Sequence, residues 1–403
     1  MPADATSIRA LLAALDPGDP QYATRFVDAV LTAARGRGAS DLHLQPTPEG
    51  LDLKWRLDGV LVPIGTFPPG VSANVVARLK VLADLLTYRT DVPQEGRIRS
   101  PETAIEMRAS TFPTLYGEKA VVRLFTSSSH FLQLADLKLG EDVEAGLGRL
   151  LSETSGAILV VGPAGSGKTT TLYACLREIA ARSQGGRSIV TLEDPIEVSL
   201  PGVAQSQVNL PAGFDLTSGL RSIMRQDPEV ILVGEIRDRA TAQIALEASL
   251  TGQLVLSSFH APSAAGAISR LLEMGLEPYV LRSGLLAVVS QRLLRKLCRC
   301  ARPVDQADDL LGLPVGQART AVGCEACAGT GFLGRMVLAE ILLIEQSDVG
   351  RAILSRASAG EIEQLARRSG MIDRWQRACA AVEEGLTSPA EVQRVLGLGI
   401  ADE

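Results

Sequence analysis

The sequence predicts an α/β protein whose main domain holds a mostly parallel sheet. Three features indicate this: apolar runs that alternate with helical stretches, a glycine-rich loop after the first run, and paired cysteines farther on. Buried strands separated by helices are typical of a doubly wound sheet. The expected parts are a short helical segment over residues 1–38, a smaller α/β domain over 39–127, a linker over 128–141, the main domain over 142–297, a cysteine-bearing segment over 298–331 and a helical region over 332–403.

Composition limits the classes of function. The 403-residue chain has 46% apolar and 21% charged residues, the balance of an ordinary globular protein. Its net charge of −6 argues against a dedicated nucleic-acid-binding protein, which usually carries a basic excess. The N-terminus lacks the pattern of a signal peptide, and apolar runs are too short to span a membrane. We therefore expect a cytoplasmic protein.

The elements are predicted from apolar periodicity and turn residues. Apolar residues with helical spacing lie between Tyr22 and Arg35, and a second helix is expected over 71–86. The expected strands of the smaller domain cover residues 41–45, 51–57, 60–64, 106–110 and 119–125. Those of the main domain cover residues 158–161, 189–192, 230–233 and 254–257.

The glycine-rich loop has the composition that cradles a nucleotide phosphate. It consists of Gly162, Pro163, Ala164, Gly165, Ser166, Gly167, Lys168 and Thr169. Glycines let successive backbone N–H groups face a phosphate, and the helix that begins near Thr170 adds its positive end. Lys168 can reach the β- and γ-phosphates, and the Thr169 hydroxyl can bind Mg²⁺. A chance glycine turn is the alternative, but the flanking strand and helix favour binding of ATP or GTP by residues 162–170.

Polar side chains at three strand ends predict one common site. Glu235 ends an apolar strand, where P-loop enzymes place an acid beside Mg²⁺ and the attacking water; Glu229, before that strand, is a poorer candidate. Glu193 and Asp194 follow a second strand, and His260 follows a third. The carboxyl ends of parallel strands face the crevice that binds ligands. The alternatives are a solvated acid or polar turn at each strand end and a structural histidine.

Two close pairs of cysteines form a candidate metal site. Cys298 and Cys300 make the first pair, and Cys324 and Cys327 make the second. Four thiolates can enclose a tetrahedral Zn²⁺ and stabilise a segment that has little core of its own. The alternative is a set of buried thiols that holds no metal.

These motifs, taken in order, resemble the secretion motor ATPases of type II secretion and type IV pilus assembly (the secretion protein E family). The matching segments are residues 39–46, 93–97, 108–111, 115–119, 191–197, 220–238 and 251–260. The last three resemble the family's aspartate box, Walker B region and histidine box. The resemblance implies a RecA-like P-loop core and a PAS-like N-terminal domain.

The resemblance also implies roles in ATP hydrolysis. Lys168 and Thr169 would hold the phosphates and Mg²⁺. Glu193 and Asp194 would support the metal and its waters. Glu235 would be the catalytic acid–base residue, next to the histidine box that contains His260.

Three arginines complete the implied site. Arg97, Arg108 and Arg123 would approach the phosphates, some of them from a neighbouring subunit. The alternative for each of them, favoured when it is taken alone, is an ordinary surface or salt-bridge arginine. Members of this family form hexameric rings that drive a platform protein of the inner membrane. The implied partners are therefore further copies of the chain and that platform protein, with peripheral association at the cytoplasmic face of the membrane and no nucleic acid.

The chain departs from the family pattern at the histidine box. Gln253 stands where a first histidine is usual, and residues 261–264 replace the usual Thr-Asn-Asp-Ala after His260. The alternatives to a secretion or pilus-assembly motor are a pilus-retraction motor, which generally lacks the cysteines, and a nucleotide-binding scaffold that does not hydrolyse ATP. A nucleic-acid translocase is less favoured because of the acidic balance.

Overall fold

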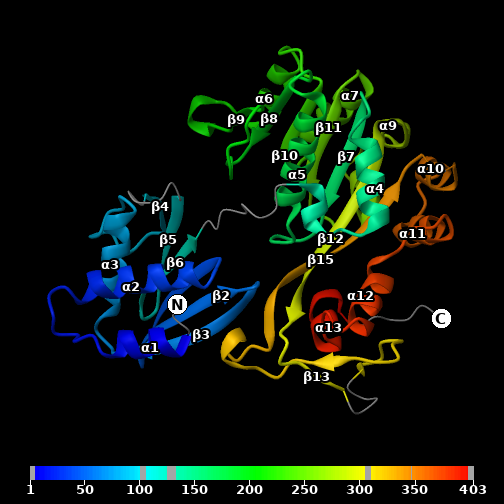
Figure 1. The fold of residues 1–403 in the computed structure, drawn as a ribbon. Helices are drawn as coiled ribbons and strands as arrows, with labels where there is room; N and C mark the ends of the chain where they lie inside the picture. The colour runs from blue at the N-terminus through cyan, green and yellow to red at the C-terminus, as the bar shows by residue number, and fades with distance from the viewer. Residues whose placement is uncertain (1–4, 100–105, 125–132, 305–309, 346, 398–403) are drawn as a thin grey trace. The chain divides into compact units, whose positions relative to one another are not determined.

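The computed structural model describes residues 5–99, 106–124, 133–304, 310–345 and 347–397. The chain divides into two compact units (Figure 1). The N-terminal unit comprises residues 1–127 with 322–334, and the C-terminal unit comprises residues 128–321 with 335–403. Residues 128–132 of the expected linker, and Phe125 of the last expected N-terminal strand, lie outside the described residues.

The N-terminal unit is built on an antiparallel sheet. Its helices are α1 (Ala5–Ala13), α2 (Tyr22–Gly36) and α3 (Ser72–Leu82). Its strands are β1 (Asp41–Thr47), β2 (Gly50–Leu57), β3 (Val60–Phe67), β4 (Gln94–Arg99), β5 (Glu106–Thr114) and β6 (Gly117–Leu124), in the spatial order β3-β2-β1-β6-β5-β4. Strand β4 was not predicted.

One face of this sheet is apolar and the other is polar. Alternate residues of β2, such as Leu53 and Trp55, are fully buried and pack in one core with Phe26 and Val30 of α2. This period-two burial is what a sheet with helices on a single face requires. The helices before residue 39 therefore belong to the same core as the strands, and the opposite face of the sheet presents the polar side chains.

The C-terminal unit is built on a seven-stranded sheet in the order β15-β12-β7-β11-β10-β8-β9. The strands are β7 (Gly156–Val161), β8 (Ile189–Glu193), β9 (Ala204–Gln207), β10 (Val230–Ile236), β11 (Leu254–Phe259), β12 (Leu285–Leu297) and β15 (Phe332–Leu343). All neighbours from β12 to β9 pair in parallel, as predicted. Every residue of β7 and β11 is buried, because helices cover both faces of the sheet.

The helices of this unit largely alternate with the strands up to β11, and the later helices come as one run of two and one run of four. They are α4 (Glu141–Leu150), α5 (Lys168–Ser183), α6 (Leu216–Ile223), α7 (Arg239–Leu250), α8 (Ala264–Glu273), α9 (Pro278–Gly284), α10 (Ser347–Leu354), α11 (Ala359–Arg368), α12 (Arg374–Glu383) and α13 (Pro389–Leu396). Two short strands, β13 (Arg302–Pro303) and β14 (Arg319–Thr320), form a separate ribbon.

The expected helical region over 332–403 is wrong in its first part. Residues 332–343 form the edge strand β15, although Leu, Met, Ala and Glu in this segment favour a helix. Leu338, Ala339, Glu340, Ile341 and Leu342 are consecutive and all buried. Burial on both faces of a sheet therefore overrides the local helical preference.

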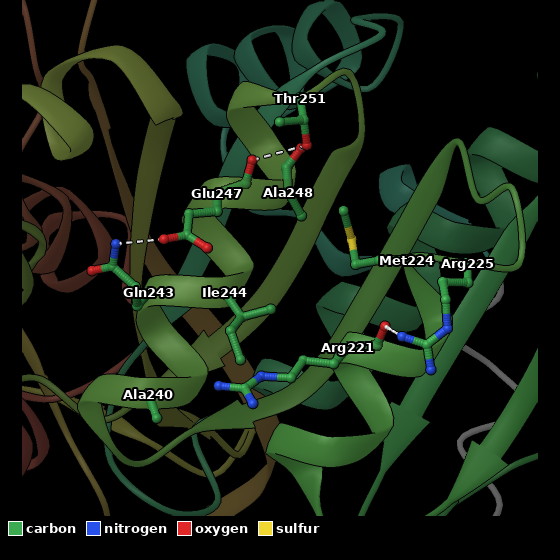
Figure 2. A pocket seen from close by; sticks show the side chains of 9 residues that line it. All are labelled: Arg221, Met224, Arg225, Ala240, Gln243, Ile244, Glu247, Ala248 and Thr251. Atoms are coloured by element: carbon green, nitrogen blue, oxygen red, sulfur yellow. Dashed lines mark hydrogen bonds between the residues drawn. The ribbon is translucent and has the colours of Figure 1, made fainter.

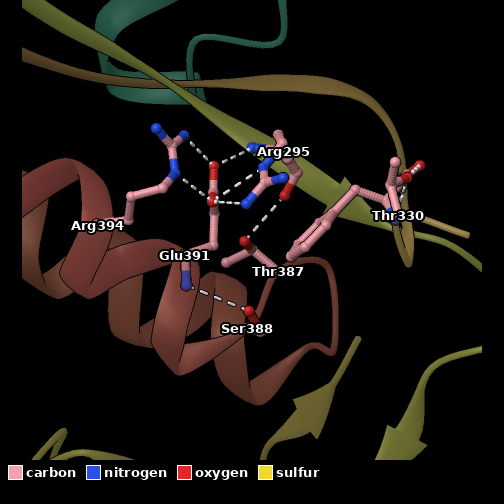
Figure 3. A network of polar contacts seen from close by, with 7 residues as sticks. Arg295, Thr330, Thr387, Ser388, Glu391 and Arg394 are labelled. Carbon is pink, nitrogen blue, oxygen red and sulfur yellow. Dashed lines mark hydrogen bonds and ion pairs between the residues drawn. The ribbon is translucent and has the colours of Figure 1, made fainter. Parts of the chain in front are cut away.

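A buried ion-pair network fixes the last helix against β12 (Figure 3). Glu391 of α13 is 1% exposed and accepts hydrogen bonds from Arg295 of β12 at 2.7 and 3.0 Å. Arg394 donates to the same carboxylate at 2.6 and 2.7 Å. Burial alone would raise the pKa of Glu391, but hydrogen bonds from Arg394 and Arg295 outweigh it and hold that pKa below its usual value.

Candidate active site

The glycine-rich loop connects β7 to α5 in the conformation that its sequence predicts. Gly167, at the start of α5, has φ 90°, in the left-handed region that favours glycine. A Cβ at Gly162 would lie 2.5 Å from the backbone oxygen of Gln291, so this position has no room for a side chain. The Ser166 hydroxyl is buried and has no hydrogen-bond partner among the described residues. Such an orphaned donor fits a loop shaped for a bound anion.

Lys168 lies over the loop. Its Nζ donates to the carbonyl oxygens of Gly162 at 3.0 Å and Pro163 at 2.9 Å. Burial lowers the pKa of Lys168, an effect that the charge of Glu235 partly offsets and that of Arg292 reinforces. Thr169 is exposed at the first turn of α5, and Thr170 follows it, half-buried. The loop therefore presents one ammonium group and one exposed hydroxyl beside a helix N-terminus.

Glu235 and His260 come together, as the sequence predicts for strand ends. Glu235 lies near the end of β10, and β11 separates β10 from the P-loop strand β7 in the sheet. His260 is the residue that follows β11. His260 Nε2 lies 2.6 Å from Glu235 Oε1, and Arg237 Nε donates to Oε2 at 2.6 Å. Arg237 Nη1 is also 3.8 Å from Asp194 Oδ2. This geometry joins three strand ends in one polar group.

Glu193 occupies a different environment from its neighbour Asp194. Its carboxylate is buried and accepts hydrogen bonds from the hydroxyls of Tyr173 and Thr191 and from the Gln205 amide. Burial, followed by the hydrogen bond and charge of Glu193, raises the pKa of Tyr173 well above its usual value. The Asp194 side chain is 46% exposed. Only the second of these two carboxylates is open to a ligand.

Gln291 of β12 is a site residue that sequence reasoning missed. Its side chain is buried and donates to the Ser166 carbonyl at 2.7 Å, while its Oε1 accepts from the Thr171 hydroxyl at 3.0 Å. The next residue, Arg292, donates to the carbonyl of Pro262 at 2.6 Å, two residues after His260. No motif marks Gln291, because its position beside the loop depends on the pairing of β12 with β7.

The three predicted arginines lie on one rung of the N-terminal sheet. Arg97, Arg108, Arg123, Asp41 and Arg56 are successive cross-strand partners on β4, β5, β6, β1 and β2. Directly opposite residues project from the same face, so four guanidinium groups and one carboxylate form a row. Asp41 contacts Arg123 Nε at 3.2 Å and Arg56 Nε at 3.4 Å. Arg56 was not predicted, since its membership depends on the hairpin register.

The four predicted metal ligands form a compact cluster. The sulfur atoms of Cys298, Cys300, Cys324 and Cys327 all lie within 4.8 Å of one another, and those of Cys324 and Cys327 are 3.7 Å apart. Thiolates around a tetrahedral Zn²⁺, with Zn–S near 2.3 Å, are separated by about 3.8 Å. The backbone N–H groups of Cys324 and Gly331 also point at Cys327 Sγ, at 3.1 and 3.2 Å. The donor set therefore fits zinc.

A surface groove of about 550 Å³ lies elsewhere, between α6 and α7 (Figure 2). Its lining residues are Arg221, Met224, Arg225, Ala240, Gln243, Ile244, Glu247, Ala248 and Thr251. None of them was predicted as a site residue, and none contributes to the polar group around Glu235. The groove is therefore separate from the polar group at the strand ends.

The sheet is buried and mostly parallel, the glycine loop follows β7, and the Glu235 carboxylate lies on β10, two strands away from β7. These features together define a P-loop nucleoside triphosphatase fold. Solved structures support this class. The chain resembles the ATPase DotB of Legionella pneumophila with a TM-score of 0.66 at 20% identity, covering 92% of this chain and 95% of that one. It resembles the pilus retraction motor PilT with bound ADP with a TM-score of 0.54 at 22% identity, covering 87% and 95%.

The chain belongs to the family described as Type II/IV secretion system protein, which it matches over residues 17–394. It is 42% identical to the type II secretion system protein E of Aeromonas hydrophila, covering 94% of this chain and 77% of that protein. It is 39% identical to the type IV pilus assembly ATPase PilB of Thermus thermophilus, covering 93% of this chain. The chain spans only 43% of the length of PilB.

The resemblance inferred from the sequence motifs is thus confirmed. The family is that of secretion and pilus ATPases. Within the described ranges, none of the helices combines the length and the apolar character needed to cross a bilayer.

Proposed function

We propose that the chain is an ATP-hydrolysing motor that works as a hexameric ring in type II secretion or type IV pilus assembly. The observation that carries this proposal is the contact of Glu235 with His260 at the strand ends beside the P-loop. A carboxylate held there by an imidazole can take the proton of a water that attacks the γ-phosphate. The name of the similar pilus assembly ATPase PilB supports this activity, and that of the similar protein E supports a role in type II secretion.

The P-loop residues would bind the triphosphate. Lys168 would exchange its two carbonyl contacts for phosphate oxygens, and the N–H groups from Gly165 to Thr169 would face the β-phosphate. Mg²⁺, bound through the Thr169 hydroxyl with Asp194 nearby, would neutralise charge on the β- and γ-phosphates. Glu193 would support this arrangement from the interior, through Tyr173 and Thr191.

The arginine row would supply the remaining positive charge. Arg97, Arg108 and Arg123 present guanidinium groups on one face of an open sheet, which suits a polyphosphate. In a ring, the row of one subunit could serve the nucleotide of another. Such an arginine stabilises the negative charge on the γ-phosphoryl group while that group is being transferred to water.

The direction of the motor and its partners are part of the proposal. The platform protein of the inner membrane would be the partner, with the ring at the cytoplasmic face of that membrane. A pilus-retraction motor is the second candidate, because the fold also resembles PilT. The cysteine cluster favours assembly or secretion, with a structural Zn²⁺ bound by Cys298, Cys300, Cys324 and Cys327.

The test is ATP turnover by the purified chain beside its Glu235→Gln variant. We expect Mg²⁺-dependent turnover that accompanies the hexamer and falls by at least about a hundredfold in the variant, since the general base is lost. Glu229→Gln is the matched control: it changes the same residue type just before the other end of β10, where, among the described residues, the Glu229 carboxylate accepts a hydrogen bond from the Ser188 N–H. Tight ATP binding without turnover in the wild-type hexamer would favour a nucleotide-binding scaffold instead.

A further inference from the structure

We propose that Gln291 is a positioning residue that sets the orientation of the P-loop peptide between Ser166 and Gly167. This inference rests on the proposed function, because it concerns how the same loop receives a nucleotide phosphate. Gln291 does not touch the reacting atoms. It acts through the P-loop backbone, which would contact the phosphate.

The side chain of Gln291 contacts both the P-loop and the helix that follows it. Its Nε2 donates to the Ser166 carbonyl at 2.7 Å, and its Oε1 accepts from the Thr171 hydroxyl at 3.0 Å, in the first turn of α5. A Cβ at Gly167 would lie 3.1 Å from the same Nε2, so the amide also lies against that residue. The side chain is 1% exposed, and water does not compete for these bonds.

The planarity of the peptide bond turns this contact into a directional one. In a trans peptide the C=O and the following N–H point in opposite directions. Because Gln291 holds the Ser166 carbonyl towards β12, the Gly167 N–H must point away from β12. Gly167 lies in the left-handed region and could otherwise rotate freely. The hydrogen bond therefore selects the one peptide orientation in which this N–H can face a phosphate.

Only a glutamine side chain meets both requirements here. The Ser166 carbonyl needs a donor, and the Thr171 hydroxyl uses the acceptor at the far end of the same amide. Methionine fills a similar volume without a donor, and ionised glutamate has two acceptors. Asparagine is one methylene shorter. The orientation of the amide is fixed, since a carbonyl oxygen can only accept.

The experiment compares ADP binding by calorimetry in the full chain, Gln291→Met and Thr171→Val. Thr171→Val removes the other partner of the amide but leaves the bond to Ser166, so it is the matched control. We expect the ADP dissociation constant to rise roughly 10- to 100-fold in Gln291→Met, the worth of one hydrogen bond to a charged group, and less than about threefold in Thr171→Val. Gln291→Met loses both buried hydrogen bonds of the amide and Thr171→Val loses one, so the fall in melting temperature should be larger in Gln291→Met.

A second variant, Gln291→Glu, covers the case in which Gln291→Met fails to fold. Burial beside the Ser166 carbonyl raises the pKa of a carboxyl group at this position, and its protonated form regains a donor, so the ADP affinity of Gln291→Glu should approach that of the wild type as the pH falls from 8 to 6. Equal weakening in Gln291→Met and Thr171→Val, or a pH-independent deficit in Gln291→Glu, would overturn the inference alone. If the wild-type chain binds no ADP or ATP, the proposed function fails as well.

Discussion

Two adjacent carboxylates, Glu193 and Asp194, show how far a residue's role depends on its surroundings. Glu193 is the last residue of β8 and Asp194 is the next residue, and the sequence motif assigns both the same role. Glu193 has three donors on its two oxygens and is buried, whereas the side chain of Asp194 is 46% exposed beside Arg237. A fully hydrogen-bonded buried carboxylate is suited to hold structure in place, and an exposed one is available to a metal ion and its waters.

This difference predicts opposite profiles for two conservative variants. Glu193→Gln should lower the free energy of unfolding by about 1–3 kcal/mol, because one donor of the network is left facing another donor. Asp194→Asn should leave stability nearly unchanged and lower the turnover number instead. Thermal unfolding and steady-state ATP hydrolysis, measured on the same preparations, separate the two. A larger loss of turnover in Glu193→Gln with an unchanged melting temperature would contradict this assignment.

At the same scale, the sequence identifies residues whose function follows from their neighbours in the chain. The P-loop from Gly162 to Thr169 is contiguous, so its motif is complete without a structure. Glu235 and His260 are distant in sequence, but both follow apolar strands, and parallel strands bring such ends together. Gln291 and Arg56 carry no such mark. Their positions depend on strand register, which a single sequence does not specify.

Among the elements, the contact of α13 with β12 depends on one buried carboxylate. Glu391 holds Arg295 and Arg394, and its side chain is fully buried. Its folded pKa lies below the ordinary value of 4.5. Its contribution to stability is therefore complete above about pH 4.5 and is lost as the pH falls through the folded pKa.

Replacing Glu391 by Gln should remove this contribution. We expect the free energy of unfolding at pH 7 to fall by roughly 3 kcal/mol, because the largely buried Arg295 and the partly exposed Arg394 lose their shared counter-charge. The difference in the free energy of unfolding between wild type and Glu391→Gln should become smaller as the pH is lowered below 4.5. Urea unfolding followed by circular dichroism at several pH values measures it. Glu384→Gln, an exposed position after α12, is the control and should show no such gap.

The element scale also shows where pattern reading fails. The four predicted parallel strands are short apolar runs between helices, and all four are present. Strands β12 and β15 were missed because they are long and only partly buried towards one end, so that they lack a clear strand signal. In β15 the composition even favours a helix. These two segments form strands because they pair, one after the other, with the edge of the sheet at β7. This pairing is a tertiary feature that the local sequence does not show.

On the scale of the whole molecule, the cysteine cluster joins residues 298–300 with residues 324–327. We expect about one zinc per chain by elemental analysis, lost in Cys327→Ser. Removal of the metal by a chelator should lower the melting temperature, because four thiolates brought this close without a cation repel one another.

The control for the zinc prediction is Cys379→Ser. Cys379 is half-buried and lies outside the cluster, so Cys379→Ser should leave the zinc content unchanged. Cys175 is unsuitable as a control: it is fully buried, which raises its pKa to about 12 and marks it as a core residue. Equal zinc content in wild type and Cys327→Ser would exclude the tetrahedral site.

The arginine row affects the stability of the N-terminal sheet that carries it. Like charges that face each other across neighbouring strands destabilise a sheet, and here four cations share a row with a single carboxylate. Asp41 offsets part of this repulsion, and Glu95, whose Oε1 lies 3.9 Å from Arg108 Nη1, offsets a further part. A polyphosphate would lower the remaining repulsion, so part of its affinity would come from the arrangement of the row itself. The side chains that weaken this domain on its own would be those that let it respond to a nucleotide.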